Sequence, residues 1–135
     1  MRIDLKENTH AFIQPYDNVD FSDIQHLNKE AGWTALANNL NTKEAWENSN
    51  VAYVVKNRDE KLIGYIRGLT DRYVSLFICE MLIHKRYRGL GIGKQLLQYV
   101  HDKYPTTRIE MLATSTSRSF YENLGYRAFY GFRKS

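Results

Sequence analysis

The sequence has few of the features that mark secreted, membrane or low-complexity proteins. Cys79 is the only cysteine, so neither an internal disulfide nor a cysteine-rich metal site can form. No stretch approaches the roughly 18 consecutive apolar residues of a membrane-spanning helix, and the N-terminus lacks the apolar core of a signal peptide. Pro15 and Pro105 are the only prolines, and no linker-like tract or repeat is present. We therefore expect a cytoplasmic protein with no metal and no membrane partner.

Length and composition are those of an ordinary soluble protein. A chain of 135 residues, 43% of them hydrophobic and 25% charged, is expected to form one domain over residues 1–135. The charge is uneven: residues 1–60 carry six Lys or Arg against ten Asp or Glu, whereas residues 61–135 carry 13 against 5. Four cations, Lys85, Arg86, Arg88 and Lys94, fall in one ten-residue window without an acid. Such a window should attract an anion.

Hydrophobic periodicity predicts a mixed α/β protein with one central sheet. Apolar residues at helical spacing, followed by glycine or proline, predict helices, and β-branched or aromatic runs between turn residues predict strands. The run over 73–84 is nearly continuously apolar, as expected for a buried central strand. The predicted helices cover 22–33, 41–49, 91–104 and 115–125, and the predicted strands cover 51–56, 62–69, 73–84, 108–113 and 126–132, with a further one near 11–14.

The segment YRGLGIGKQLL, residues 87–97, places three glycines between a predicted strand and a predicted helix. A helix N-terminus offers unpaired N–H groups and partial positive charge, and glycine removes the side chain that would keep a phosphate away. Two familiar phosphate loops do not fit. A Walker loop needs glycine at Arg88 and Ser or Thr at Gln95, and the dinucleotide fingerprint needs a third small residue that neither Lys94 nor Leu96 supplies. The segment is therefore a candidate anion site of another kind.

Two motifs together point to a family. Arg88, Gly91 and Gly93 satisfy the pattern R-x-x-G-x-G, with Gly89 as a further match, and residues 120–126 read F-Y-x-x-x-G-[FY] about 30 residues downstream. With its element order and length, the chain resembles the GCN5-related N-acetyltransferases, the GNAT family. The resemblance implies an α/β fold with a central mixed, mostly antiparallel sheet, flanked by about four helices. That sheet would be splayed between its fourth and fifth strands, over 73–84 and 108–113, with acetyl-CoA in the opening as co-substrate.

The resemblance also implies where acetyl-CoA is held. Its pyrophosphate would rest on backbone amides of the glycine segment, and its pantetheine arm would pair like a strand with the backbone near residues 81–83. The residues assigned to acetyl-CoA in this way are Met81, Leu82, Ile83, Arg88, Gly89, Leu90, Gly91, Ile92, Gly93, Lys94, Ser115 and Tyr121.

Two side chains are candidates for proton transfer. Tyr121 matches the general-acid tyrosine of the family, which would protonate the departing thiolate, although a tyrosine that only packs is the alternative. Glu80 is the single acid in the strand over 73–84, and a carboxylate in apolar surroundings is suited to act as a general base unless it is ion-paired. An ion-paired structural Glu80 is the alternative, and His84, a weaker candidate, is expected to be solvated. Direct attack by an amine, usual in the family, leaves Cys79 a structural thiol.

The acceptor site is expected to lie among the N-terminal helices. Trp33 is assigned to it together with Glu80, and Trp46 could also wall an acceptor pocket, although core packing explains either tryptophan. The acidic excess of residues 1–60 suits a cationic acceptor, and surface solvation explains it equally well. The predicted activity is direct transfer of acetyl to a primary amine of a small molecule or peptide, by a monomer or homodimer.

Two other functions fit parts of the sequence. A non-catalytic acyl-CoA-binding or sensor module would keep the glycine segment without needing Tyr121 and Glu80, and the presence of both favours an enzyme. A nucleic-acid-binding domain would suit the net charge of +4. However, the positive charge gathers in one glycine segment, and no zinc, RNA-binding or recognition-helix signature is present. We therefore expect no nucleic-acid partner.

Overall fold

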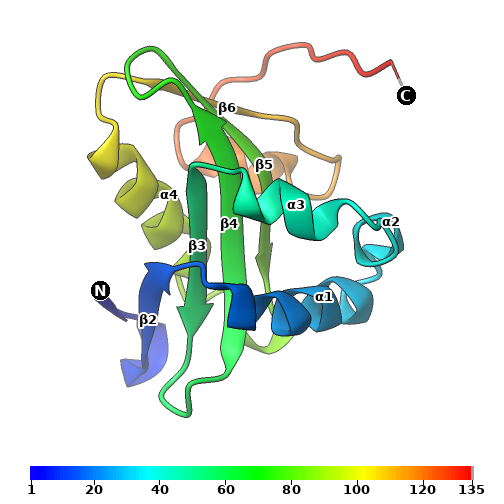
Figure 1. The fold of residues 1–135 in the computed structure, drawn as a ribbon. Coiled ribbons are helices and arrows are strands. Elements are labelled where there is room, and N and C mark those ends of the chain that lie inside the picture. Colours follow the sequence, from blue (N-terminus) through cyan, green and yellow to red (C-terminus); the bar gives the residue numbers. More distant parts are fainter. Residues whose placement is uncertain (135) are drawn as a thin grey trace.

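The fold is built on one sheet whose strands lie side by side in chain order. The structure is a computed structural model and describes residues 1–134. Strands β1 to β5 are each antiparallel to their neighbours, whereas β6 runs parallel to β5 (Figure 1). A parallel pair needs a crossover, and helix α4 (Ile92–Lys103) supplies it. The strands are β1 (Arg2–Asp4), β2 (His10–Pro15), β3 (Val51–Lys56), β4 (Leu62–Thr70), β5 (Ser75–Ile83) and β6 (Arg108–Met111).

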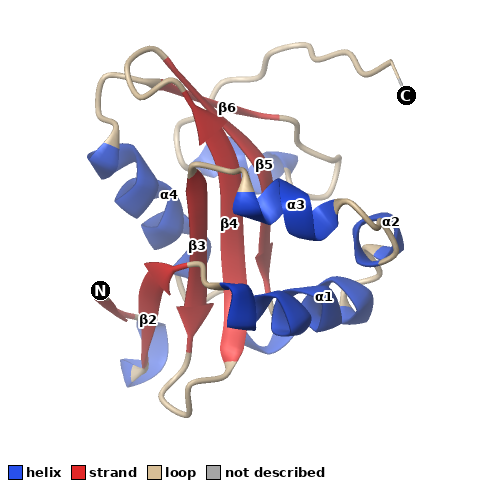
Figure 2. Cartoon of the chain, viewed as in Figure 1, coloured by secondary structure: helices blue, strands red, loops and turns tan. Residues whose placement is uncertain are grey.

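Helices cover both faces of this sheet (Figure 2). In this view α1 (Phe21–Glu30) and α3 (Thr42–Glu47) lie in front of the strands, α2 (Thr34–Ala37) lies to their right, and α4 and α5 (Arg118–Asn123) lie behind them. The remaining elements are short 3-10 helices: η1 (Lys6–Asn8), η2 (Asn18–Asp20) and η3 (Lys85–Tyr87). Among residues 1–134, no helix is both long enough and apolar enough to cross a bilayer.

Two apolar clusters hold the helices on the sheet, one on each face. Because successive strand residues point to opposite faces, the neighbours Val54 and Val55 belong to different clusters. The rear cluster joins α4 to the strands and includes Val55, Ile66, Leu76, Leu96 and Val100. The front cluster joins α1 and α3 to the strands and is formed by Ile24, Leu27, Trp46, Val54, Tyr65 and Leu82.

The predicted fold class is confirmed: the sheet is mixed and mostly antiparallel, with helices on both faces. The predicted central strands and the four predicted helices are all present, with ends that differ by a few residues. Strand β1 and the single-turn helix α2 were not predicted. Because β1 adds one strand at the start, the predicted fourth and fifth strands are β5 and β6.

The predicted strand over 126–132 is wrong. Residues 127–134 form no strand and make no backbone hydrogen bond, and Tyr130 and Phe132 are 98% and 96% exposed. Alternating aromatic residues give this segment a strand-like pattern, but a strand also needs a partner edge. Strand β6 ends at Met111. Gly131 packs against Leu112, the residue just after it, so the C-terminal segment contacts the chain where β6 no longer offers a strand edge.

Candidate active site

The sheet opens between β5 and β6. The two strands pair only where residues 75–78 face residues 108–111. Beyond that point, residues 79–83 of β5 have no strand partner on this side within the described chain. Backbone groups along such an edge are available to an extended ligand. The predicted splay is therefore present, with its mouth at the C-terminal half of β5.

A β-bulge lies at the mouth of this opening. Arg67 of β4 pairs with Glu80, while the next residue, Gly68, pairs with Ile78, so Cys79 is an extra residue on β5. The bulge directly follows the last β5–β6 pair. Burial raises the pKa of the Cys79 thiol, which keeps it protonated at neutral pH and unsuited to be a nucleophile.

The glycine segment follows β5 and begins α4. Gly91 is the N-cap of α4 with a φ of 97°, and Gly89 has a φ of 80°. Glycine adopts this left-handed region without strain. No side chain caps α4, and a Cβ at Gly89 would meet no atom within 4 Å, whereas one at Gly91 would meet only Gln95 at 3.9 Å. The first N–H groups of α4 therefore lie behind an open, uncapped turn, as an anion site requires.

Gly93 has a different role, because it makes room for packing. A Cβ on Gly93 would lie 2.9 Å from Cζ of Phe120 and 3.4 Å from Cε of Met81. Glycine at this position lets α5 approach the first turn of α4 beside β5. Met81 packs against the rear cluster, whereas Leu82 is buried in the front cluster.

The other predicted residues of the segment are divided between surface and core. Arg88 donates a hydrogen bond from Nε to the carbonyl oxygen of Ile83 at 3.0 Å, which ties the loop to the end of β5. Lys94 is exposed on the first turn of α4, Leu90 is half-buried, and Ile92 is buried in the rear cluster. The charged side chains of this segment are therefore exposed, whereas Ile92 belongs to the core.

Tyr121 lies on α5 and packs, half-buried, against the rear cluster. Its ring centroid is 5.1 Å from that of Phe120 and 5.8 Å from that of Tyr126. Burial, and then the neighbouring Tyr126, raise the pKa of the Tyr121 hydroxyl, which is therefore protonated at neutral pH. A protonated hydroxyl is what a general acid must offer. Ser115 is exposed in the turn before α5.

Glu80 forms an ion pair with Arg67. Nη2 of Arg67 donates to Oε1 of Glu80 at 2.8 Å and lies 2.7 Å from Oε2, and the two side chains are only 14% and 12% exposed. Nη1 of Arg67 donates to Oγ of Ser49 at 3.1 Å. Glu80 is on the front face with Leu82, two residues along β5, whereas Tyr121 packs behind the sheet. The two candidate catalytic side chains therefore flank the opening from opposite faces.

Arg67 and Ser49 were not identified from the sequence. A signal for Arg67 was present: it is the only charged residue in the predicted strand over 62–69, as Glu80 is the only acid in the next strand. Lone opposite charges on consecutive apolar strands are expected to meet, because an unpaired buried charge is costly. Ser49 carries no such signal, because it lies in the loop between α3 and β3.

The tryptophans and His84 have mainly structural surroundings. Trp46 is 2% exposed at the centre of the front cluster, and Trp33 packs, half-buried, against the same cluster. His84 was expected to be solvated, and this is wrong: its Nδ1 accepts a hydrogen bond from the Arg86 N–H, and its Nε2 lies 3.4 Å from a Glu30 carboxylate oxygen. Its side chain is mostly covered because the end of α1 lies over it.

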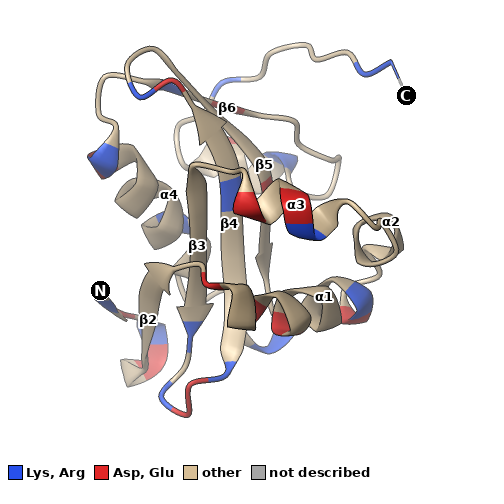
Figure 3. Ribbon diagram, viewed as in Figure 1, with Lys and Arg blue, Asp and Glu red and all other residues tan. Residues whose placement is uncertain are grey.

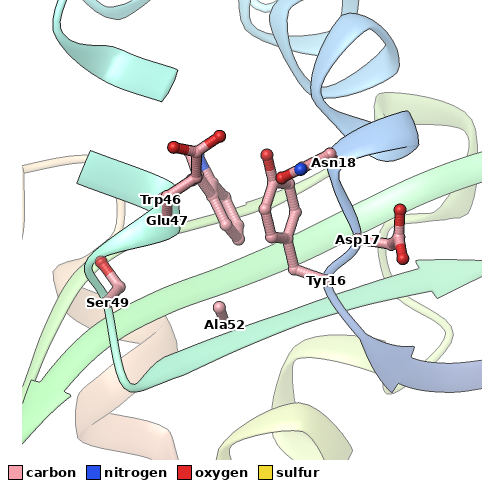
Figure 4. Close-up of a pocket in the computed structure, with 7 residues that line it drawn as sticks. All are labelled: Tyr16, Asp17, Asn18, Trp46, Glu47, Ser49 and Ala52. Atoms are coloured by element: carbon pink, nitrogen blue, oxygen red, sulfur yellow. The ribbon is translucent and has the colours of Figure 1, made fainter. Parts of the chain in front are cut away.

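A cavity of about 470 Å³ lies on the front face, and one of its lining residues, Ser49, accepts the hydrogen bond from Arg67 (Figure 4). Of its residues, the sequence pointed only to Trp46. The lining consists of Tyr16, Asp17, Asn18, Trp46, Glu47, Ser49 and Ala52. Across residues 1–134, no group of three or more His, Cys, Asp or Glu side chains is placed to hold a metal ion.

Relatives of this chain with assigned names are N-acetyltransferases. The chain is 27% identical over 85% of its length to the uncharacterized N-acetyltransferase ycf52 of Pyropia yezoensis, and 30% identical over 80% to a ycf52-like N-acetyltransferase of Prochlorococcus marinus. It spans 69% and 63% of those relatives, and 51% of the chloroplastic GCN5-related N-acetyltransferase 2 of Arabidopsis thaliana.

The fold comparison agrees. A GNAT-family acetyltransferase from Streptococcus pneumoniae superimposes with a TM-score of 0.74 over 93% of this chain and 99% of its own, at 21% identity. The sequence profile of the acetyltransferase (GNAT) domain matches residues 17–133. Because that match covers most of the sequence and includes both the opening and the glycine segment, the chain belongs to the GNAT family of N-acetyltransferases.

Proposed function

We propose that the chain transfers the acetyl group of acetyl-CoA directly to a primary amine of a small molecule or peptide. The observation that carries this proposal is the place where the β5–β6 ladder stops, next to the uncapped, glycine-lined start of α4. An extended thioester arm needs a free strand edge, and its pyrophosphate needs exposed N–H groups. This chain offers both, with seven residues between Ile83 at the end of β5 and Gly91 at the N-cap of α4.

The residues present fit acetyl-CoA as a substrate. Backbone amides between Arg88 and Lys94 would hold the pyrophosphate, and the free edge at residues 81–83 would pair with the pantetheine arm. Ser115, in the turn before α5, is proposed as a further contact. Gly89 and Gly91 have no side chain that would keep a phosphate from the backbone N–H groups, and a Cβ at either position would meet almost no other atom.

The chemistry needs two proton movements. The amine nitrogen attacks the thioester carbonyl carbon, the carbon–sulfur bond breaks, and the product is an amide with free coenzyme A. Glu80 takes the proton that the amine loses, directly or through water, and Tyr121 gives its hydroxyl proton to the departing sulfur. Solvent then returns the proton to Tyr121. The raised pKa of Tyr121 supports this role, since the hydroxyl must be protonated when the thiolate leaves.

A second function is favoured by one observation. Because Arg67 already neutralises Glu80, the carboxylate is less available to an amine, as in a module that binds acyl-CoA without turnover. In the enzyme, Arg67 would orient the Glu80 carboxylate. When a cationic acceptor binds, one carboxylate oxygen of Glu80 would leave Arg67 and face the amine. The two functions differ in whether an amine triggers thiol release.

The test combines binding with turnover. Calorimetry with acetyl-CoA measures whether the opening binds it, and thiol release from acetyl-CoA is followed across a panel of primary amines. Amine-dependent release supports the transferase. Tight binding with no release from any amine would support the binding module, and absence of binding would contradict both functions.

A further inference from the structure

The hairpin formed by β1 and β2 contacts the glycine segment. The Lys6 N–H, in the turn between the two strands, donates a hydrogen bond to the carbonyl oxygen of Leu90 at 3.1 Å. Nε2 of Gln95, on the first turn of α4, donates to the carbonyl oxygen of Asp4 at 2.8 Å. Two hydrogen bonds therefore join this N-terminal hairpin to the start of α4.

The turn of the hairpin is itself well fixed. Leu5 packs against the rear cluster, and its N–H donates to the carbonyl oxygen of Thr9 at 2.8 Å. Oγ1 of Thr9 donates to the carbonyl oxygen of Lys6 at 3.0 Å. Glu7 and Asn8 have φ values of 62° and 58°, a conformation that residues other than glycine keep only where the surrounding structure holds it. The turn therefore presents the Lys6 N–H in a defined direction.

The peptide group between Leu90 and Gly91 benefits from such a contact. Gly89 and Gly91 flank Leu90, and both have positive φ. Glycine reaches this region because it lacks the side chain that limits other backbones, so the chain around it is also freer to move. The hydrogen bond from Lys6 opposes that freedom, because it holds the carbonyl oxygen of Leu90.

The orientation of this peptide group sets where the Gly91 N–H points. In a trans peptide the carbonyl and the N–H point in opposite directions, and no peptide bond among residues 1–134 is cis. Because the carbonyl oxygen of Leu90 is directed at η1, the Gly91 N–H is turned away from η1. Among residues 1–134 this N–H has no acceptor. The hairpin thus sets the direction of a free donor at the N-cap of α4.

The turn contributes direction and not charge. It carries one cation and one acid, Lys6 and Glu7, which are neighbours in the sequence and are both exposed (Figure 3). Their charges cancel, so the turn adds little attraction for a phosphate. The hairpin also precedes residue 17, where the match to the GNAT domain begins. The contact is therefore a feature of this chain beyond the part that the family profile describes.

We infer that the N-terminal hairpin positions the acetyl-CoA site: the Lys6 N–H, by holding the Leu90 carbonyl oxygen, keeps the Gly91 N–H directed at the pyrophosphate. This inference rests on the proposed binding of acetyl-CoA. Gln95 keeps the hairpin on α4, so Lys6 and Gln95 are positioning residues that do not themselves touch the ligand. A peptide group that is already oriented loses less conformational entropy when the pyrophosphate binds, and the affinity for acetyl-CoA is higher as a result.

Lys6→Pro tests the inference, because proline has no N–H to donate. The backbone tolerates proline there: Lys6 is the first residue of η1 and has a negative φ, and the preceding Leu5 is extended, with a ψ of 168°. Lys6→Ala is the matched control, since it removes the same side chain and keeps the N–H. We expect the Kd of acetyl-CoA, measured by calorimetry, to be about tenfold higher in Lys6→Pro than in Lys6→Ala, the factor that fixing one residue supplies.

Gln95→Met is a second test, which decides the matter if Lys6→Pro does not fold. It removes the contact with Asp4, and Gln98→Met is its control because Gln98 donates within α4, to Asp102. We expect acetyl-CoA to bind about threefold more weakly to Gln95→Met than to Gln98→Met. In each positioning variant KM for acetyl-CoA should rise with Kd, whereas kcat at saturation should change little because no reacting group is altered.

The NMR order parameter of the Gly91 amide gives a readout that needs no ligand, and it should be lower in Lys6→Pro than in Lys6→Ala. Equal Kd in these two variants would overturn the inference and leave the proposed function standing, even if their melting temperatures differ, because the contact would then serve stability alone. A wild-type protein that binds no acetyl-CoA would contradict the proposed function. In that case a lower Gly91 order parameter in Lys6→Pro would still support the positioning of this N–H, and an equal one would overturn it.

Discussion

Arg67 and Glu80 form a nearly covered ion pair beside the opening, and Glu80 is the proposed proton acceptor. Both side chains are nearly covered, and desolvation makes such a pair costly unless its partners stay together. Arg67 also donates a hydrogen bond to Ser49, which gives its guanidinium a second contact besides Glu80. A carboxylate held beside a fixed cation can exchange one ionic partner for another when an ammonium arrives.

Replacing Glu80 with Gln tests whether Glu80 is the proton acceptor and whether its charge stabilises the fold. We expect kcat to fall about 10²–10⁴-fold because the proton acceptor is lost. The free energy of unfolding should also fall, by up to about 3–5 kcal/mol, because Arg67 is left without its counter-charge. Adding Arg67→Met should restore most of the stability and none of the activity. An E80Q enzyme with the wild-type kcat would show that water or another group accepts the proton.

Tyr121→Phe tests the acid. The ring packing survives, so acetyl-CoA affinity and melting temperature should change little, while kcat falls about 10²–10⁴-fold. The pKa of the hydroxyl is raised above its ordinary value of 10.0, so deprotonation of this group should lower kcat only at a pH above 10, and not near neutrality. The pH profile of kcat measures this effect: the loss of activity at alkaline pH should be present in the wild type and absent in the variant. A fully active Y121F enzyme would assign Tyr121 to packing alone.

At the scale of elements, the contact between α4 and α5 depends on one missing side chain. Gly93 lies where Phe120 and Met81 converge, so helix, helix and strand meet at a single point. Gly89, four residues earlier, has free space around it and is needed for its positive φ. Two glycines of one motif are thus required for different physical reasons.

Alanine substitutions at Gly93 and Gly89 distinguish the need for space from the need for a positive φ. Gly93→Ala should destabilise by about 1–3 kcal/mol through overpacking, and Phe120→Leu should recover part of that loss. Gly89→Ala should cost about 1–2 kcal/mol through its left-handed backbone, with no recovery from Phe120→Leu. Urea unfolding of the four variants measures both. Equal recovery in the two backgrounds would contradict the separate roles.

The elements that sequence reasoning located are those whose pattern is local. The apolar strands β3, β4 and β5 and the periodic helix α4 carry their own signal, as does the motif pair that marks the glycine segment and Tyr121. The segment 126–132 misled because its alternation is also local, while strand pairing is not. Arg67 meets Glu80 and Ser49 through the register between neighbouring strands, and a pattern within one element does not reveal that register.

At the scale of the whole molecule, the exposed C-terminal aromatics stand apart from the rest. Tyr130 and Phe132 bury almost nothing, and no backbone hydrogen bond fixes residues 127–134. Deleting the chain from Arg127 onward should therefore change the melting temperature by only a few degrees, because few native contacts are lost. It should also lower self-association, since exposed aromatic groups promote it. A loss of cooperative unfolding on deletion would show that this segment is part of the core.

The short β5–β6 ladder also bears on how long the protein survives near proteases. Only four residue pairs join β6, with α5 behind it, to the antiparallel β1–β5 part of the sheet. Segments joined by so few hydrogen bonds open as a unit well below the global unfolding free energy. A molecule that bound in the opening and contacted both sides would add its binding free energy to that opening step. If acetyl-CoA binds as proposed, we expect it to slow amide hydrogen exchange and proteolytic cleavage in β6 and α5 far more than in β3 and β4.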